Sequence, residues 1–462
     1  MLSGPKAGAR RAIERLVPRG ALTLSFLSLA YFGMGLIRNR AFASAFGAGA
    51  ELDAYNAAFR IPEIALDILV ASGLSAPFVP IFSRLREAPD GEHRAGDFGR
   101  TVLTFAIAIM AIAMGVLFAA APWIAETAFP TFDPQTRALY VDLLRINCAA
   151  QVLFAGSIAL GEVLVADRRF LFYGLAPILY TGGIVVGTVA LGPSLGIQGS
   201  AFGALGGAAA HLGIRAIGAA RAGFRIGPAI RVRTAEFREF IRLMLPRMLS
   251  YPIDPIVVFF ITLLATQQGP GTATALSFVL DYQFVPVQVI AITFSLAVFP
   301  TLSRAYAEDD GPRFRSVLLR NVATIGGLTA AAAIVLAVGS GLVIRVFLGG
   351  GRFDQADVAL TSSLLAAFAI SIPIDSLSYP LSRAMYATHN TVFQVLASIA
   401  GLATLVVVAQ VVVPSLGVVG IPIAYAAGGA AKLAVLTAFL IPRVGRIGRG
   451  PAITNPEPAT AR

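Results

Sequence analysis

Long apolar segments alternate with short polar connections from residue 21 to residue 441. Each apolar segment holds at least ~20 residues, the length that a helix needs to cross a hydrocarbon core about 30 Å thick. The pattern therefore predicts an all-α polytopic membrane protein with twelve transmembrane helices. The segments are 21–46, 54–82, 101–122, 137–165, 170–191, 197–217, 237–266, 273–302, 319–339, 358–386, 392–413 and 417–441.

Arginine is distributed unevenly among the connections. Most odd-numbered connections are nearly free of arginine, whereas the even-numbered connections 83–100, 166–169, 218–236 and 303–318 are rich in it. Connection 340–357 departs from this alternation because it contains Arg345 and Arg352, and 387–391 is merely polar. Basic residues accumulate on the cytoplasmic side of membrane proteins. The alternation predicts a multi-pass protein of the cytoplasmic (inner) membrane with both termini in the cytoplasm.

Two short motifs recur at a nearly constant spacing. Pro193-Ser194-Leu195-Gly196 returns as Pro414-Ser415-Leu416-Gly417, and Phe78–Arg84 (FVPIFSR) returns as Val298–Arg304 (VFPTLSR). Each copy would contain six helices, and an even number keeps both copies in the same orientation. We predict two parallel six-helix repeats around a central cleft, as in transporters. The predicted parts are a basic N-terminus (1–20), an N-lobe (21–217), a basic linker (218–236), a C-lobe (237–441) and a polar cytoplasmic tail (442–462).

Composition supports a membrane protein and excludes several other classes. Only 13% of the residues are charged, about half the share in soluble proteins. The net charge of +11 is explained by arginines at the ends of apolar segments, so no nucleic acid is expected as a partner. Cys148 is the only cysteine, which excludes a disulfide framework. The chain has no recognisable metal cluster, Walker motif or nucleophile–base pair. We therefore expect no enzyme, no catalytic residue, no metal and no cofactor.

The second apolar segment carries a stripe of charged residues. Asp53, Arg60 and Asp67 are spaced by seven residues, and Glu63 joins the same helix face. Pro62 lies among them and can bend the helix. Charges inside a membrane span are costly and need a reason. One interpretation is an ion-pair ladder that only holds helices together, and the other is a substrate-binding stripe that lines a cavity. We favour the cavity, because four charges on one face exceed what packing requires.

Three further charged residues lie deep in predicted spans. Arg38, in the first segment, could pair with Asp53 or with an anionic substrate, because a guanidinium binds phosphate through two hydrogen bonds. Asp254 lies between Pro252 and Pro255, and Asp281 lies in the eighth segment. An acid in a proline-broken helix is a candidate for Na⁺ or H⁺ coupling. A structural hydrogen bond explains either acid equally well.

The sequence resembles the MurJ/MviN family of lipid II flippases, which belong to the multidrug/oligosaccharidyl-lipid/polysaccharide exporter superfamily. The resemblance rests on motifs between residues 33 and 391. They are Gly35–Arg38 (GLIR), Phe46–Gly49 (FGAG), Asp53–Tyr55 (DAY), Ala58–Pro62 (AFRIP), Ser72–Pro80 (SGLSAPFVP), Ala166–Phe170 (ADRRF), Leu245–Arg247 (LPR), Pro300–Arg304 (PTLSR), Gly351–Asp354 (GRFD) and Tyr386–Thr391 (YATHNT).

The resemblance implies a central cavity in which Arg38 and Asp53 occupy important positions. It also implies arginines at three positions where this sequence has Phe32, Leu66 and Asp281. Arg60 lies near one of these positions and is expected to compensate. Family members usually have fourteen helices, so the chain is expected to lack the last two.

The implied function is translocation of an undecaprenyl-pyrophosphate-linked peptidoglycan precursor, similar to lipid II, from the inner to the outer leaflet by alternating access. Arg38 and Arg60 would bind the pyrophosphate, and Asp53 would position them. Membrane potential, Na⁺ or H⁺ would drive the cycle, and the chain is expected to act as a monomer among membrane lipids. Two alternatives stay open. One is a related exporter of another lipid-linked glycan or of small cationic compounds, and the other is a paralogue that transports nothing.

Overall fold

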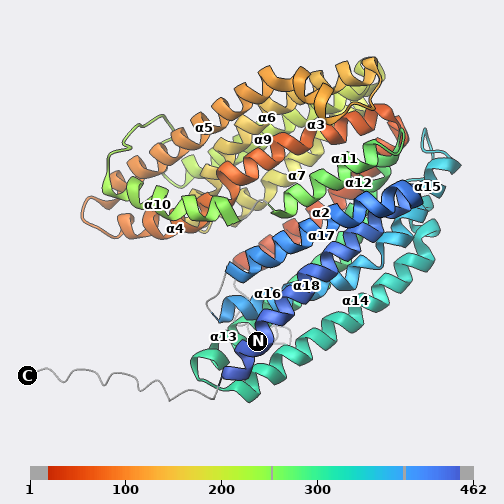
Figure 1. Cartoon of the computed structure of the whole chain (residues 1–462). Helices are drawn as coiled ribbons and strands as arrows, with labels where there is room; N and C mark the ends of the chain where they lie inside the picture. The colour runs from red at the N-terminus through yellow and green to blue at the C-terminus, as the bar shows by residue number, and fades with distance from the viewer. Residues whose placement is uncertain (1–18, 251–252, 389–391, 448–462) are drawn as a thin grey trace, which may run out of the picture. The chain divides into compact units, whose positions relative to one another are not determined.

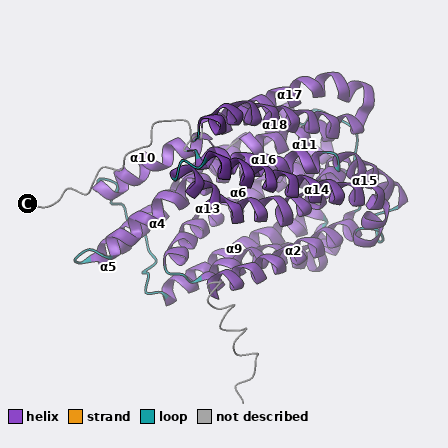
Figure 2. Ribbon diagram, turned by 90° about the horizontal axis from the view of Figure 1, so that it is seen from below, coloured by secondary structure: helices purple, strands orange, loops and turns teal. Residues whose placement is uncertain are grey.

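The computed structural model describes residues 19–250, 253–388 and 392–447, and these residues are almost entirely helical (Figure 2). Among them, the only β-type pairing is an isolated bridge between Gly350 and Phe353. The all-α class predicted from the sequence is confirmed for this part of the chain. The predicted terminal segments 1–20 and 442–462 lie largely outside the described residues.

Helices of the first half of the chain follow the predicted apolar segments closely (Figure 1). They are α2 (Arg19–Phe46), α3 (Ala50–Leu66), η1 (Asp67–Ala71), α4 (Ser72–Arg86), α5 (Gly91–Ala128), α6 (Pro134–Ala166), α7 (Phe170–Val186), η2 (Gly187–Leu191), α8 (Gly192–Leu195) and α9 (Ile197–Arg221). The segments η1 and η2 are π-helical and continue the helices on either side of them. Pro62 lies inside α3, five residues before η1 begins.

The second half contains a similar series of elements. They are α10 (Ala235–Ser250), α11 (Ile253–Thr266), α12 (Thr272–Pro286), the π-helical η3 (Val287–Ile292), α13 (Thr293–Ala307), α14 (Gly311–Phe347), α15 (Gln355–Phe368), α16 (Ser371–Ala387), α17 (Val392–Leu416), the 3₁₀ turn η4 (Gly417–Val419) and α18 (Gly420–Arg446). The predicted interruption near Pro252 falls between α10 and α11, at residues outside the described part.

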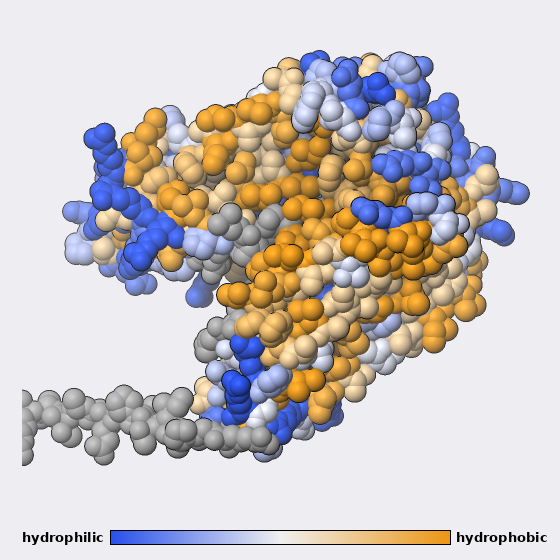
Figure 3. Space-filling view, in the orientation of Figure 1, coloured by the Kyte–Doolittle hydropathy of each residue, from blue (hydrophilic) through white to orange (hydrophobic). Residues whose placement is uncertain are grey.

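Seven of the described helical runs are long and apolar enough to cross a membrane. An eighth is obtained if α15 and α16, which meet at an angle of 43°, form one bent span. Apolar side chains cover much of the visible surface, while hydrophilic residues gather towards the helix ends (Figure 3). On α14, for example, Val335, Val338 and Leu342 are at least two-thirds exposed. Such surface is stable only in an apolar solvent, as expected for helices that face lipid.

Corresponding turns of the two halves share unusual backbone conformations. The π-helical segments η1 and η3 begin 220 residues apart, at Asp67 and Val287. In the repeated Pro-Ser-Leu-Gly motif, Gly196 has φ +57° and Gly417 has φ +58°. Only glycine adopts this region without a steric cost, so the motif dictates the same reversal between helices in both places.

Close glycine contacts join neighbouring helices in each half. In the first half, a Cβ added to Gly203 of α9 would lie 2.5 Å from the carbonyl oxygen of Gly183 on α7. Gly187 and Gly207 make equally close approaches to the facing backbone. In the second half, Gly401 of α17 faces Gly428 of α18 in the same way. Small residues allow membrane helices to pack with their backbones in contact, where dispersion forces replace the missing hydrophobic effect.

The chain forms two compact units whose boundaries differ from the halves of the sequence. The first unit comprises Met1–Thr274 and Phe347–Gln355, and the second comprises Ala275–Val346 and Ala356–Arg462. The start of α12 and the α14–α15 connection therefore belong structurally to the first unit. Every contact described below lies within one unit.

Candidate functional site

Arg38 lies in the last third of α2 with its guanidinium held by the neighbouring residue. Its Nε and one Nη donate hydrogen bonds to Oδ1 of Asn39, at 3.1 and 2.9 Å. The Asn39 side chain is buried, whereas Arg38 is half-buried. Two bonds to one oxygen fix the plane of the guanidinium and leave other N–H donors of Arg38 for further partners. The sequence reasoning did not find Asn39.

Tyr55 of α3 and Tyr180 of α7 lie close to this arginine. Arg38 and Glu63 act electrostatically on both tyrosines, which places side chains from three helices around one polar region. Tyr55 is buried, stacks on Phe59 with ring centroids 4.3 Å apart, and has no hydrogen-bond partner for its hydroxyl among the described residues. A buried hydroxyl without a partner is unfavourable, and the described residues supply no partner for this oxygen. Neither tyrosine was predicted, because a tyrosine in an apolar segment ordinarily indicates packing.

Arg60 and Glu63 lie one turn apart on α3, as their spacing predicts. Nη1 of Arg60 is 3.7 Å from Oε2 of Glu63, and their side chains are 25% and 44% exposed. Nε of Arg60 is buried and has no hydrogen-bond partner in the described part of the chain. Asp67 is half-buried and opens the π-helical segment η1. The partly exposed Arg60–Glu63 pair is weak as an isolated salt bridge, and it leaves Arg60 with donors to spare.

Asp53 is held at the opposite end of α3 by backbone donors. Its carboxylate accepts hydrogen bonds from the N–H of Gly271, the N–H of Thr274 and the hydroxyl of Thr274, at 2.6–2.7 Å. The first turn of α12 has N–H groups without intrahelical partners, and a carboxylate is the strongest acceptor for them. Asp53 is therefore fully engaged in capping α12. Its predicted role in positioning Arg38 and Arg60 stays a prediction.

The end of α2 is closed by the α14–α15 connection. The Arg352 N–H donates to the carbonyl of Ser44 at 3.0 Å, and the Arg352 guanidinium reaches the carbonyl of Ala45. Conversely, the guanidinium of Arg40 on α2 donates a hydrogen bond to the carbonyl of Gly349 in this connection. These bonds satisfy carbonyls that the last turn of a helix leaves without partners. Together with Asp53, they tie the α2–α3 end to segments from the second half of the sequence.

The two predicted coupling acids lie in different surroundings. Asp254 is exposed in the first turn of α11, within the first unit, and Asp281 is exposed on α12, within the second unit. A polar network that the prediction largely missed lies in the second unit instead. Gln283 donates to the hydroxyl of Ser371 and to Asp375, and the hydroxyl of Tyr425 also donates to Asp375.

Comparison with known proteins assigns the family. The model of the family described as "Lipid II flippase MurJ" matches residues 42–454. The chain belongs to the MurJ family. It is 23% identical over 438 residues to a probable lipid II flippase MurJ of Treponema pallidum, covering 91% of this chain and 81% of that protein. It is also 23% identical over 420 residues to the lipid II flippase MurJ of Burkholderia cenocepacia, covering 89% and 81%.

Solved structures agree with this assignment at the level of the fold. A lipid II flippase MurJ in an inward closed conformation has a TM-score of 0.79 at 20% identity, and covers 93% of this chain and 90% of that one. An inward-facing multidrug transporter of the MATE family has a TM-score of 0.72 at 16% identity, covering 91% and 96%. The chain therefore shares its fold with a MurJ and with a MATE transporter of the MOP superfamily. Its family and its apolar helices make it a multi-pass protein of the inner membrane.

At three positions where the resemblance implies an arginine, this MurJ-family chain has a different residue. Leu66 is buried beside η1, Phe32 is half-buried on α2, and Asp281 is exposed on α12. In the first unit, therefore, Arg38 and Arg60 are the two arginines of the predicted substrate-binding set.

Proposed function

We propose that this chain moves a lipid-linked peptidoglycan precursor, lipid II or a close relative, from the inner to the outer leaflet of the inner membrane. The match of the MurJ family model to residues 42–454 supports this proposal most directly. Lipid II flippases are transporters, which agrees with the expectation that the protein is not an enzyme. The substrate would be a glycan linked through pyrophosphate to an undecaprenyl chain.

The proposed architecture is twelve transmembrane helices in two parallel six-helix repeats. The series α3–η1–α4–α5 recurs as α12–η3–α13–α14, with starting residues 50, 67, 72 and 91 matched by 272, 287, 293 and 311. Parallel repeats rock about a site at their interface in many transporters. Alternating access through a cleft between the repeats, with both termini in the cytoplasm, is the mechanism that we infer from this arrangement.

In this mechanism, Arg38 and Arg60 bind the pyrophosphate of the substrate. Arg38 acts electrostatically on Tyr55, whose hydroxyl is buried, and Arg60 has a buried Nε with no hydrogen-bond partner among the described residues. Arginine binds phosphate oxygens in pairs, and such charge-assisted bonds are stronger than neutral ones. Glu63 and Asp67 complete the proposed substrate-binding set and keep the empty site from accumulating excess positive charge. The glycan would pass through the polar region while the lipid chain stays in the bilayer.

The hydrogen bonds at the α2–α3 end would hold the outer side closed during part of the transport cycle. The predicted topology places this end on the outer side, where Asp53 holds Gly271 and Thr274 while Arg40 and Arg352 join α2 to residues 349–352. In the proposed mechanism, these bonds break when the outer side opens. Membrane potential or a cation, Na⁺ or H⁺, would supply the energy, with Asp254 and Asp281 as the candidate coupling acids. We propose a monomer that works among membrane lipids without nucleic acid.

The test is rescue of a bacterial strain depleted of its own lipid II flippase. We expect the wild-type chain to restore growth, and Arg38→Ala and Arg60→Ala to abolish rescue at equal membrane levels of protein. Arg345→Ala, which removes an exposed arginine outside the site, is the matched control and should rescue normally. Failure of the well-expressed wild-type chain would refute lipid II as substrate, whereas rescue by both arginine variants would refute the site.

Asp281 favours a second candidate, export of a small cationic compound or of another lipid-linked glycan. An exposed acid on α12 replaces a position where the resemblance implies arginine, and this exchange would attract cations. A vesicle uptake assay with a lipophilic cation separates the two candidates. Uptake that Asp281→Asn abolishes would support the exporter.

A further inference from the structure

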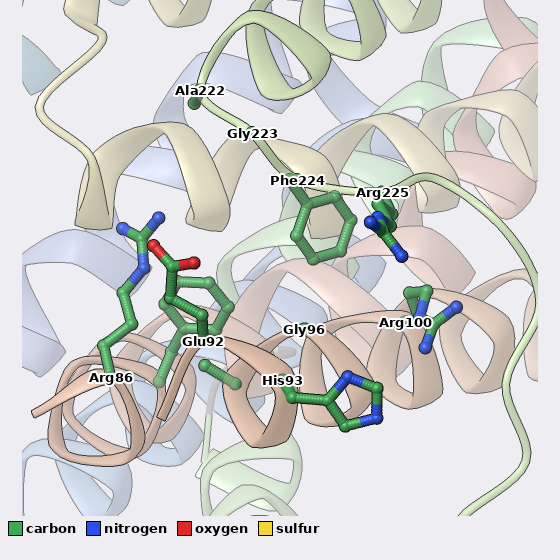
Figure 4. Close-up of a pocket in the computed structure, with 11 residues that line it drawn as sticks. Arg86, Glu92, His93, Gly96, Arg100, Ala222, Gly223, Phe224 and Arg225 are labelled. Carbon is green, nitrogen blue, oxygen red and sulfur yellow. The ribbon is translucent and has the colours of Figure 1, made fainter. Parts of the chain in front are cut away.

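A basic pocket lies in the first unit where α4 ends and α5 begins, and it shares no lining residue with the candidate site. Its volume is about 370 Å³, and it is lined by the end of α4, the first three turns of α5 and residues 222–225, which follow α9. Figure 4 shows Arg86 and Glu92 on one side of Phe224, and Arg100 and Arg225 on the other. The predicted topology places this end on the cytoplasmic side.

The segment after α9 is fixed in place, so the pocket is already formed. Phe224 packs so tightly on α5 that a Cβ added to Gly99 would lie 2.7 Å from its ring. Further along, the N–H of Ala229 donates to the Thr104 hydroxyl at 3.1 Å, and the N–H of Arg231 donates to the Thr101 hydroxyl at 3.3 Å. The aromatic ring and the two threonines hold residues 222–231 along α5. Open space over Gly96, where an added Cβ would meet nothing within 4 Å, forms part of the pocket.

Charge is unbalanced between the two sides of Phe224. On one side Arg86 is paired with Asp167, and Glu92 adds a second acid. On the other side a single carboxylate, Asp97, is shared by Arg100, by Arg231 at 2.9 Å and by His93 at 3.7 Å. Arg225 adds a further positive charge there. The side formed by Arg100 and Arg225 therefore carries excess positive charge.

Two guanidinium groups on this side have donors without acceptors. Among the described residues, the buried Nε of Arg100 has no hydrogen-bond partner, and Arg225 makes no hydrogen bond or ion pair. Two other arginines on the same surface are paired: Arg84 with Glu239, and Arg94 with Glu236. Positive-inside topology accounts for arginines on this surface, but it does not require two guanidinium groups to line one preformed pocket with donors unpaired.

We propose that the Arg100–Arg225 side of this pocket binds a phosphate group. Guanidinium groups from two elements match the oxygens of a phosphate, which accepts several charge-assisted hydrogen bonds at once. The phosphate belongs either to an anionic phospholipid headgroup or to a free cytoplasmic anion. Basic pockets between membrane helices on the cytoplasmic side bind acidic headgroups. This site is separate from the translocation site, and the proposal does not depend on what the protein transports.

The test measures ligand-dependent thermal stability of the purified full-length chain in neutral detergent. Phosphatidylglycerol, phosphatidylcholine, inorganic phosphate and pyrophosphate are titrated at constant ionic strength. We expect a saturable rise in unfolding temperature with phosphatidylglycerol but not with phosphatidylcholine if the site takes a headgroup. A saturable rise with phosphate or pyrophosphate alone assigns the site to a free anion. No saturable rise with any of the three anions overturns the proposal.

Arg225→Ala is the decisive variant because Arg225 has no structural partner to lose. We expect the half-saturating ligand concentration to rise about tenfold or more, as loss of a charge-assisted bond implies, while the unfolding temperature without ligand stays unchanged. Arg225→Lys should recover part of the affinity. Arg233→Ala, which removes an exposed arginine of the same connection outside the pocket, is the matched control. Wild-type affinity in Arg225→Ala, or an equal loss in Arg233→Ala, contradicts the proposal.

Discussion

The helical run α3–η1–α4 and its counterpart α12–η3–α13 have the same geometry but very different chemistry. Each consists of an α-helix, a π-helical segment and a second α-helix, with a proline directly after a pair of Phe and Val in the last helix. Yet α3 and η1 carry five charged residues, whereas α12 and η3 carry one, Asp281. One backbone design thus supports a charged stripe in one half and a nearly neutral helix in the other.

The fourth predicted span of each half differs from its counterpart in geometry rather than in charge. In the first half, α6 runs unbroken from Pro134 to Ala166, whereas α15 and α16 cover the corresponding stretch with a bend of 43°. The network of Gln283, Ser371, Asp375 and Tyr425 lies just past this bend. A break in a helix frees backbone groups, and neighbouring polar side chains can then satisfy them. The first half therefore concentrates charge on a continuous scaffold, and the second places a polar network with a single acidic residue, Asp375, around a break.

The largest expected difference between the halves concerns the glycine contacts. Gly203→Ala should unfold much of the protein, because its new methyl group would lie 2.5–2.7 Å from the backbone of Gly183 and Gly187, which cannot move aside. Overpacking of this kind costs about 1–3 kcal/mol or more. Gly401→Ala should be milder, since its closest contact is 2.9 Å, to the carbonyl of Gly428.

Thermal unfolding in detergent measures both effects. Gly206→Ala is the control on the same helix as Gly203, because an added Cβ there meets nothing within 4 Å. Its unfolding temperature should equal or slightly exceed that of the wild type, since alanine favours helices. If Gly401→Ala proves as damaging as Gly203→Ala, the two helix pairs are equally tight and the comparison fails.

The second-largest loss of stability is expected when the carboxylate that caps α12 is removed. Asp53→Ala leaves two backbone N–H groups and one hydroxyl without acceptors, and each buried orphan costs about 1–3 kcal/mol. We expect a marked fall in unfolding temperature and loss of rescue in the depletion strain. Asp53→Asn keeps one acceptor oxygen and should lose about half as much stability. Equal stability of Asp53→Ala and the wild type would show that the cap is unimportant.

In the second half, the comparable substitution should cause a smaller loss of stability. Gln283→Leu removes the amide that donates to Ser371 and Asp375, at 2.9 and 2.8 Å. Asp375 keeps the bond from Tyr425, and a net loss of about 0.5–1.5 kcal/mol per hydrogen bond is expected. A comparison of the unfolding temperatures of Gln283→Leu and Asp53→Ala measures this difference. A larger loss of stability in Gln283→Leu would show that the network around Asp375 contributes more to stability than the cap of α12.

Much of this fold follows from local sequence, and most of the site does not. Apolar length predicts the spans, and the repeated Pro-Ser-Leu-Gly motif predicts matching turns because glycine alone tolerates the required φ. The pairing of Arg60 with Glu63 follows from helical spacing. By contrast, the acceptor role of Asp53 depends on Thr274, which is 221 residues away. Arg225 becomes part of a pocket only because Phe224 packs on Gly99. No periodicity in the chain encodes such distant contacts.

Arg352, one of the two arginines that break the charge alternation, offers the smallest and most specific prediction. Arg352 lies in a connection predicted to be outside, yet its backbone N–H and guanidinium both serve carbonyls at the end of α2. Because the backbone bond survives substitution, Arg352→Ala should cost at most about 0.5 kcal/mol, as for an exposed contact. It should also leave the orientation of α14 and α15 unchanged, since this arginine stabilises a helix end and does not set topology. Labelling of a single cysteine placed in the 340–357 connection, with Cys148 replaced by alanine, would test this. Inversion of labelling in the Arg352→Ala background would show that the residue is a topological charge after all.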